Sequence, residues 1–181
     1  NDESYNSSSS SVVQGKENRT NLIPTTNDYF LDLKNYQKKA KINDTIFSNL
    51  YEIVEIKTNI KFSAKASKFE INNMTPSEIG NLINEIKSLI AINHPSILKF
   101  IGYSTVNFRN KPKPVIVTEL APNQSLDDIL ESERNGKKIP NWDDTKKLIN
   151  IFGIASGMSY LHSHDILHRD LKPNNILVDK D

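Results

Sequence analysis

Eight consecutive residues constrain both the fold and the chemistry of this chain: His168-Arg169-Asp170-Leu171-Lys172-Pro173-Asn174-Asn175. Their types and spacing suit phosphoryl transfer. Asp170 offers a carboxylate that can accept a hydroxyl proton, Lys172 can neutralise charge on a phosphoryl group, and Asn175 supplies an amide oxygen for Mg²⁺. A polar turn between a helix and a strand is the alternative. Eight residues at fixed offsets, followed by the apolar run Ile176-Leu177-Val178, favour a site.

The composition is that of an ordinary globular protein. The 181 residues are 36% hydrophobic and 25% charged, with a net charge of +1. This balance gives no argument for a nucleic-acid or membrane partner. Because there is no cysteine, disulfides, thiolate nucleophiles and cysteine zinc sites are excluded. No apolar run approaches the roughly 18–20 residues that cross a bilayer, and the start lacks a secretory signal, so we expect a soluble, cytoplasmic protein.

The sequence divides into two regions. Residues 1–28 are rich in Ser and Asn, including the run Ser7 to Ser11, and are predicted to be disordered because they bury too little apolar surface. A plain solvated tail is favoured there over a set of phosphorylation sites. From Tyr29 onward the hydrophobic pattern rises, and a folded domain is predicted for residues 29–181.

The first part of this domain is predicted to contain strands around one helix. Four segments have strand-like patterns: 50–56, 60–66, 97–102 and 115–120. A turn at Thr58-Asn59 joins the first two, and a basic, proline-bearing turn between Arg109 and Pro114 separates the last two. Thr75 and Glu78 form a capping box for a helix with Pro76 at its first position, which His94-Pro95 ends.

The second part is predicted to be helical. Ser125 caps a short helix, and after a break at Gly136 and Pro140 we expect Asn141 to cap a longer one. The apolar residues of this longer helix share one face: Leu148, Ile151, Phe152, Ala155, Met158 and Leu161. Strands followed by helices predict an α/β (α+β) fold with a sheet lobe and a helical lobe.

The motif at residues 168–175 matches the protein-kinase catalytic loop H-R-D-x-x-x-x-N. From about Tyr29 to Asp181 the chain resembles protein kinases of the tyrosine-kinase-like group. The resemblance implies a kinase-like two-lobed fold, with residues 29–120 as the amino-terminal lobe (antiparallel sheet plus C-helix) and residues 121–181 as the hinge and the start of an incomplete helical lobe. It also implies an enzyme that uses ATP and Mg²⁺ to phosphorylate protein substrates. Lys172 is typical of serine/threonine rather than tyrosine kinases.

The resemblance assigns roles to individual residues. Asp170 and Lys172 would be catalytic, together with Lys65, which aligns with the lysine of V-A-I-K, and its partner Glu85. Asn175 would bind Mg²⁺. The implied ATP-binding residues come from the segment aligned with the family's glycine-rich loop, the predicted strand at 60–66, the hinge and the end of the chain: Ile42, Leu50, Ser63, Lys65, Thr118, Glu119, Ala121 and Leu177. Considered singly, Lys65 and Glu85 are more typical of solvated surface charges than of a site.

Two departures from the family pattern bear on activity. The segment aligned with the glycine-rich loop replaces all three glycines, with Asn43, Thr45 and Ser48. A left-handed backbone there would cost on the order of 1–2 kcal/mol per Cβ-bearing residue, and about 1.4 kcal/mol weakens nucleotide binding tenfold; Asp44 adds repulsion. The sequence also stops before any Asp-Phe-Gly. We therefore expect the 181-residue chain alone to transfer little phosphate, and the apolar face of its long helix to be exposed.

Two other interpretations remain open. The lost glycines favour a pseudokinase-like binding module that presents surfaces to a regulatory protein partner without turnover. A metal site at His162, His164 and His168 is the weaker idea, because His168 is already explained by the catalytic-loop pattern.

Overall fold

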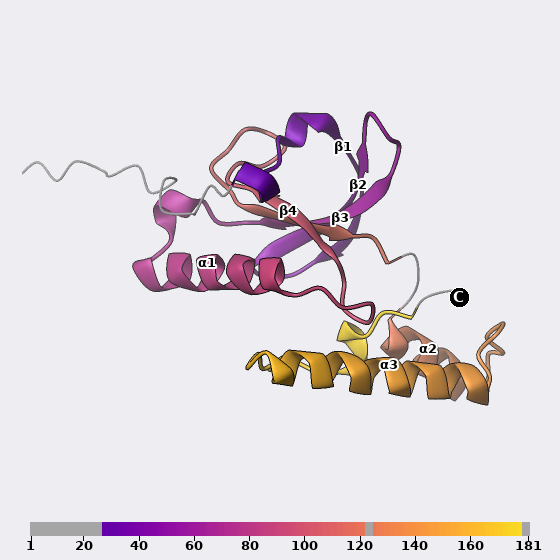
Figure 1. Cartoon of the computed structure of the whole chain (residues 1–181). Coiled ribbons are helices and arrows are strands. Elements are labelled where there is room, and N and C mark those ends of the chain that lie inside the picture. The colour runs from indigo at the N-terminus through magenta and orange to yellow at the C-terminus, as the bar shows by residue number, and fades with distance from the viewer. Residues whose placement is uncertain (1–26, 122–124, 179–181) are drawn as a thin grey trace, which may run out of the picture.

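The computed structural model of the protein describes residues 27–121 and 125–178. It contains a sheet with one long helix against it, and a second layer of helices below (Figure 1). The predicted tail lies outside the described residues up to residue 26, whereas Asn27–Tyr29 form a short 3-10 helix. The expected sheet lobe and helical lobe are confirmed.

Five strands form one antiparallel sheet within the described residues, in the order β1-β2-β3-β5-β4. Their bounds are β1 (Tyr36–Asp44), β2 (Ser48–Glu55), β3 (Lys61–Ser67), β4 (Phe100–Ser104) and β5 (Val115–Glu119). The β2–β3 hairpin turns where predicted, with Asn59 at φ 58°. β4 begins at Phe100 rather than Ile97, because a turn closed by the Ile97 N–H and the His94 carbonyl comes first.

The sheet buries both faces. On one face α1 (Pro76–Ala91) packs over Phe100, Tyr103 and Ile116. The opposite face holds a second apolar cluster: Leu33, Ile53, Ala64, Ala66, Val115 and Val117. β3 alternates between the two faces because successive strand side chains point to opposite sides.

The predicted capping box of α1 is confirmed. The Thr75 hydroxyl accepts from the Glu78 N–H, and the Glu78 carboxylate accepts from the Thr75 N–H at 2.7 Å, with Pro76 at the first helical position. The helix ends at Ala91, just before His94-Pro95. Both ends of the helix that carries Glu85 are therefore fixed by local sequence.

The helical lobe contains α2 (Leu126–Arg134) and α3 (Asp144–Ser163). Ser125 caps α2, as predicted, in a capping box with Asp128. The predicted cap of α3 was wrong: Asp143, not Asn141, accepts from the Lys146 N–H at 2.8 Å. Asn141 instead takes a left-handed backbone with φ 60°, which asparagine tolerates better than most residues, so it belongs to the preceding turn.

Packing of α3 against the sheet lobe involves the connection between α1 and β4. The Tyr160 hydroxyl accepts from the Asn93 N–H at 3.1 Å, and the Ser156 hydroxyl lies 3.2 Å from His94 Nε2. Gly157 is buried beside Ser96. These contacts hold the two lobes together through one side of α3.

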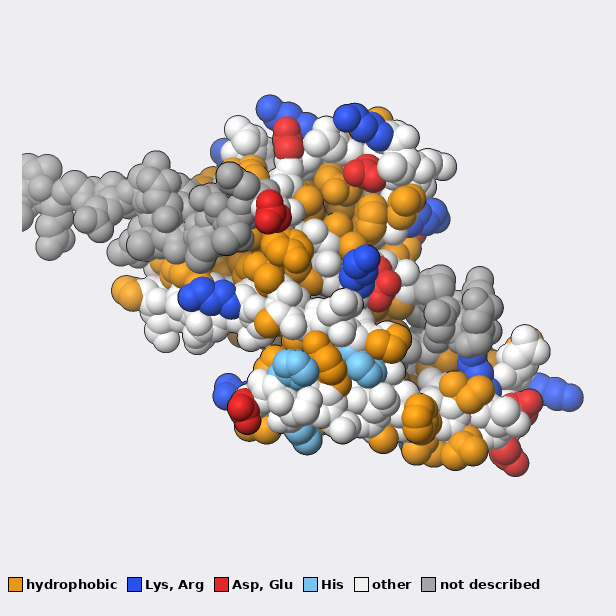
Figure 2. Space-filling model, viewed as in Figure 1, with side chains coloured by type: hydrophobic (Ala, Val, Ile, Leu, Met, Phe, Trp, Pro, Cys, Tyr) orange, Lys and Arg blue, Asp and Glu red, His pale blue; other side chains and the backbone are white. Residues whose placement is uncertain are grey.

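The predicted apolar face of α3 is divided between core and surface. Leu161 is buried, but Leu148, Ile151 and Phe152 are 66%, 62% and 74% exposed. Figure 2 shows hydrophobic side chains along this lower part of the molecule. Exposure was expected for the whole apolar face; it is confirmed at Leu148, Ile151 and Phe152 but is wrong for Leu161, which is buried. Within the described ranges, no helix has both the length and the apolar character to cross a bilayer.

Gly102 in β4 is predicted to be sensitive to substitution because a Cβ there would lie 2.5 Å from the Tyr29 carbonyl oxygen and 2.7 Å from Leu31 Cγ. Gly102→Ala should destabilise the protein by roughly 1–3 kcal/mol, as overpacking does. The matched control is Gly80→Ala in α1, where nothing lies within 4 Å; it should stabilise by about 0.5–1 kcal/mol. Urea unfolding of both variants measures the difference, and equal effects would contradict the predicted close approach.

Candidate active site

Strand register gathers several predicted nucleotide-binding residues on one sheet face. Lys65 lies opposite Leu50 of β2, and Ser63 lies opposite Thr118 of β5. Directly paired residues share a face, as do residues two apart in a strand. Leu50, Ser63, Lys65 and Thr118 therefore project from the same face of the sheet, the one that α1 covers through Ile116.

Lys65 and Glu85 form an ion pair. Lys65 Nζ lies 2.9 Å from Glu85 Oε1, although the two residues are 20 apart in sequence. α1 delivers Glu85 because its neighbour Ile86 is buried in the sheet-facing cluster. The side chains are 51% and 43% exposed, so the pair contributes at most about 0–1 kcal/mol to stability. Its main effect is to orient the lysine ammonium.

The second group of polar side chains surrounds Asp170. Lys172 Nζ lies 3.0 Å from Asp170 Oδ1. Asn175 Nδ2 donates to Asp170 Oδ2 at 2.8 Å and to the Asp170 carbonyl at 2.7 Å. Both carboxylate oxygens therefore have a partner, and the exposed aspartate is held in one orientation.

This loop is tied to the start of α2. The Leu126 N–H donates to the Ile176 carbonyl at 2.8 Å, and Asn174 Nδ2 donates to Asp127 Oδ2 at 3.0 Å. Figure 1 shows the segment in yellow above α2 and α3, on the side that faces the sheet. The sequence analysis did not predict this anchoring role of Asp127 and Asn174, although Asn174 lies within the catalytic-loop motif at residues 168–175.

Arg169 carries an unusual backbone conformation within the same loop. Its φ is 63°, in the left-handed region that a non-glycine residue rarely adopts. Such conformations cost on the order of 1–3 kcal/mol and gather at functional sites. The loop geometry is thus imposed by its surroundings, in agreement with a functional role for the adjacent Asp170.

The contacts of Asp170 keep it ionised. The hydrogen bond from Lys172, followed by that from Asn175, lowers the pKa of the Asp170 carboxyl below its usual value. The group is therefore a carboxylate throughout the neutral range and can accept a hydrogen bond from a substrate hydroxyl.

Removing the ammonium beside Asp170 should reverse this effect. We expect Lys172→Met to raise the pKa of Asp170 toward its ordinary value, because the largest stabilising contact is lost. The carboxylate would then become protonated at a higher pH as the solution is acidified. Carbon-13 NMR of the labelled aspartate side chains measures the titration. An unchanged Asp170 titration in the variant would show that Lys172 does not hold the carboxylate.

The segment aligned with the glycine-rich loop forms a tight hairpin between β1 and β2. The Thr45 N–H donates to the Ser48 carbonyl at 2.9 Å, and the Ser48 N–H donates to the Thr45 hydroxyl at 3.0 Å. None of the described residues 42–51 has a positive φ. The predicted left-handed strain at Asn43, Thr45 and Ser48 is thus wrong for this conformation, because side-chain hydrogen bonds close the turn without it.

Asp44 at this hairpin is neutralised by two lysines. Lys41 and Lys68 both form ion pairs with its carboxylate, and their hydrogen bonds, that from Lys41 being the stronger effect, lower its pKa to about 2. Because the pKa is lowered, the ion pairs of Asp44 stabilise the folded state fully when the pH is above the ordinary aspartate pKa near 4. This stabilisation is lost as the pH falls toward about 2. The repulsion expected from Asp44 is accordingly reduced.

The other predicted ATP-binding residues have fewer fixed contacts than Lys65 and Asp170. Ile42 lies within an irregularity of the β1–β2 register and is 50% exposed. The Thr118 hydroxyl donates to the Glu119 carbonyl at 3.1 Å, which leaves that oxygen a second lone pair. Ala121 lies at the edge of the described residues, just before residues 122–124, which lie outside them. Leu177 forms an isolated bridge with Ser125 and is 40% exposed.

Asn175 offers an oxygen that could hold a metal ion. Among the described residues, Asn175 Oδ1 accepts no hydrogen bond, since only Nδ2 of this amide is engaged. An uncharged oxygen beside a carboxylate suits Mg²⁺, which binds oxygen ligands. The alternative metal site receives no support, because no three His, Asp or Glu side chains converge in the described part of the chain.

Comparison with known proteins decides the family. Residues 36–181 match the protein kinase domain. The chain belongs to the protein kinase family. This kinase domain is 31% identical over 157 residues to a probable L-type lectin-domain containing receptor kinase VI.1 of Arabidopsis thaliana, an alignment that covers 84% of the chain and 22% of the relative.

Other relatives of the kinase domain come from distant organisms. A probable serine/threonine-protein kinase, kinY of Dictyostelium discoideum, is 33% identical over 150 residues, covering 78% of the chain and 25% of the relative. The MAP kinase kinase kinase wis4 of Schizosaccharomyces pombe is 27% identical over 144 residues, covering 80% and 10%. The chain thus spans between a tenth and a quarter of the length of these three relatives.

Proposed function

We propose that this kinase domain binds ATP with Mg²⁺ and serves the phosphorylation of serine or threonine hydroxyls on protein substrates. The observation that carries the proposal is the Asp170 carboxylate, held between Lys172 at 3.0 Å and Asn175 at 2.8 Å. This arrangement supports acceptance of a hydroxyl proton next to a cation. Serine/threonine specificity rests on Lys172 and on the similarity to kinY of Dictyostelium discoideum, a probable serine/threonine-protein kinase.

Each residue has a defined part in this proposal. ATP supplies the phosphoryl group and Mg²⁺ neutralises its phosphates when they are bound. Lys65, oriented by Glu85, attracts the α- and β-phosphates, while Asn175 offers its free amide oxygen to the metal. Asp170 orients the substrate hydroxyl and accepts its proton, and Lys172 stabilises the negative charge that develops.

The 181 residues contain no Asp-Phe-Gly, the family's principal acidic metal ligand. We therefore propose that the chain by itself binds nucleotide but transfers little phosphate. Its placement in the tyrosine-kinase-like group and in the cytoplasm rests on the sequence resemblance and composition alone.

A pseudokinase-like binding module is the second candidate function. The hairpin supports it, because Thr45 and Ser48 bond to one another and Lys68 is engaged by Asp44. These groups are then unavailable to phosphate oxygens. In this case the domain would present surfaces to a regulatory protein without turnover.

Thermal unfolding of the 181-residue chain with increasing Mg²⁺-ATP tests the proposed function. We expect a saturable rise in melting temperature, because a ligand that binds only the folded state stabilises it by about 2.7 kcal/mol at 100 times its Kd. Mg²⁺ with inorganic phosphate is the control and should give no comparable rise. No response to Mg²⁺-ATP would contradict nucleotide binding and favour the binding module.

A further inference from the structure

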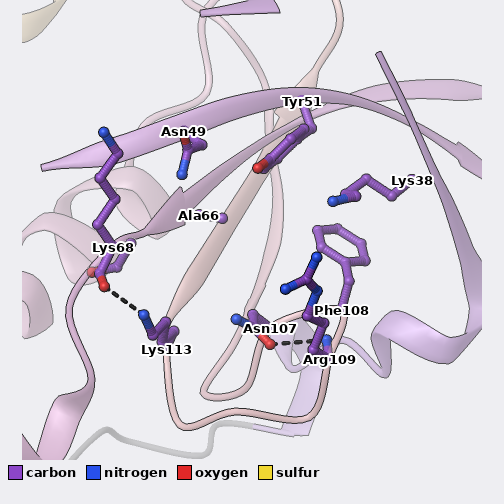
Figure 3. Close-up of a pocket in the computed structure, with 10 residues that line it drawn as sticks. Lys38, Asn49, Tyr51, Ala66, Lys68, Asn107, Phe108, Arg109 and Lys113 are labelled. Carbon is purple, nitrogen blue, oxygen red and sulfur yellow. Dashed lines mark hydrogen bonds between the residues drawn. The ribbon is translucent and has the colours of Figure 1, made fainter. Parts of the chain in front are cut away.

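A pocket on the sheet lobe lies away from the candidate active site. It has a volume of about 240 Å³ and is lined by β1, β2, β3 and the β4–β5 loop (Figure 3). Ala66 at its base belongs to the apolar cluster on the sheet face opposite α1, and Tyr51 and Phe108 pack against that cluster. The pocket is therefore on the other side of the sheet from Lys65 and Glu85.

The lining is strongly basic although the whole chain has a net charge of only +1. Four of the ten lining residues are cationic and none is acidic: Lys38, Lys68, Arg109 and Lys113. Asn49, Ser67 and Asn107 add amide and hydroxyl groups. The cations come from three separate segments, so the folded structure, rather than a run of basic sequence, concentrates this charge.

The loop that carries two of these cations is held in place. Asn107 Oδ1 accepts from the backbone N–H groups of Arg109 at 2.9 Å and Lys111 at 3.1 Å. Lys113 Nζ donates to the Lys68 carbonyl at 2.6 Å, and Lys38 Nζ lies 4.3 Å from the centre of the Tyr51 ring. A fixed loop loses little entropy when a ligand binds.

Three of the four cations in this pocket are not neutralised by a carboxylate in the described part of the chain. Within the described residues, the Arg109 guanidinium forms no ion pair, and neither do the ammonium groups of Lys38 and Lys113. Lys68 is different, since its ammonium is engaged by Asp44. Figure 3 shows the Arg109 and Lys38 side chains directed toward the space below Tyr51. A guanidinium with free donors matches the oxygens of a phosphate group.

We propose that this pocket binds a phosphoserine or phosphothreonine side chain on a protein segment. Its volume lies below the range of about 300–1,000 Å³ typical of drug-sized ligands and suits one phosphate monoester with its short side chain. Because the site is concave, it can accept a protruding side chain more readily than the flat surface of a membrane. Arg109, Lys113 and Lys38 would contact the phosphate oxygens.

The test measures binding of phosphopeptides to the 181-residue chain by fluorescence anisotropy. The probe is a labelled peptide of residues 4–16 phosphorylated at Ser9, compared with its unphosphorylated form and with a phosphoserine peptide of unrelated sequence. We expect saturable binding that requires the phosphate. Binding of both phosphopeptides supports a general phosphoserine site, and binding of the first alone supports the chain's own Ser-rich segment as its source.

Substitutions locate the binding site. Arg109→Gln and Lys113→Gln should each weaken phosphopeptide binding by about tenfold or more, as expected for loss of a charged hydrogen bond. Arg109 is exposed and Lys113 half-buried, so the first variant should fold even if the second does not. Lys87→Gln is the matched control, because it removes the same charge from the exposed surface of α1 and should leave affinity unchanged.

Three results would overturn the proposal. The first is that the unphosphorylated peptide binds as tightly as the phosphopeptide. The second is that Lys87→Gln weakens phosphopeptide binding as much as Arg109→Gln does. The third is that phosphatidylserine vesicles displace the phosphopeptide whereas free phosphoserine does not. The measurement needs no ATP, so its outcome is independent of the proposed kinase function.

Discussion

Lys65→Met is expected to remove most of the Mg²⁺-ATP-induced rise in melting temperature. The ammonium of Lys65 lies 2.9 Å from Glu85 and projects from the sheet face that also carries Leu50, Ser63 and Thr118. If this ammonium contacts the phosphates, its loss should weaken binding by roughly 10- to 100-fold, since hydrogen bonds to charged groups contribute about 1.5–3 kcal/mol. The variant should still fold, because the pair is half-exposed and contributes little to stability.

Lys61→Met provides the matched control for this prediction. Lys61 lies on the same strand, projects from the same face and forms a similar ion pair with Glu52 at 3.0 Å. It is four residues from Lys65, toward the turn between β2 and β3. Melting curves at several Mg²⁺-ATP concentrations should show a normal response for Lys61→Met. A normal response for Lys65→Met as well would mean that nucleotide, if bound, does not contact the predicted cleft.

Elements with a strong local signal were predictable from the sequence. The capping boxes at Thr75 and Ser125 are fixed by residues three apart, and both are present in the structure. The 20-residue separation of Lys65 and Glu85 was informative only with the family resemblance, since each charge alone resembles a surface residue. The resemblance supplied the long-range information that periodicity lacks.

Other features depend on tertiary contacts that sequence patterns do not specify. β1 was missed because its residues are nearly all polar and exposed, so its pairing with β2 provides the evidence for the strand. The cap of α3 was misplaced because Asn141 and Asp143 are equally good capping residues, and the path of the preceding turn decides between them. The glycine-rich loop was misjudged because the hydrogen bonds between Thr45 and Ser48 could not be foreseen.

The proposed phosphate-binding pocket also depends on tertiary structure. The sequence showed a basic turn near Arg109, but a cluster with Lys38 and Lys68 required the sheet order. β1 and the β4–β5 loop are separated by more than 60 residues in the chain. Only the folded arrangement brings their cations around one space.

Ile53 is a core position where truncation is expected to have a large effect on stability. This β2 side chain is 0% exposed and lies in the cluster opposite α1, with Ala64 and Val117. Ile53→Ala should lower the free energy of unfolding by about 2–5 kcal/mol, because it removes buried methylene groups and leaves a cavity. For a domain of this size, the melting temperature should fall by roughly 5–15 °C.

Two further isoleucine variants make this prediction specific to burial. Ile56→Ala removes the same atoms just after β2, where the side chain is 63% exposed, and should change stability by no more than about 0.5 kcal/mol. Ile53→Val should cost about 0.5–1.5 kcal/mol and remains measurable if Ile53→Ala does not fold. Urea unfolding compares all three. If Ile56→Ala cost as much as Ile53→Ala, the side chains of β2 would point to the wrong faces, and the register that places Leu50 beside Lys65 would be wrong with them.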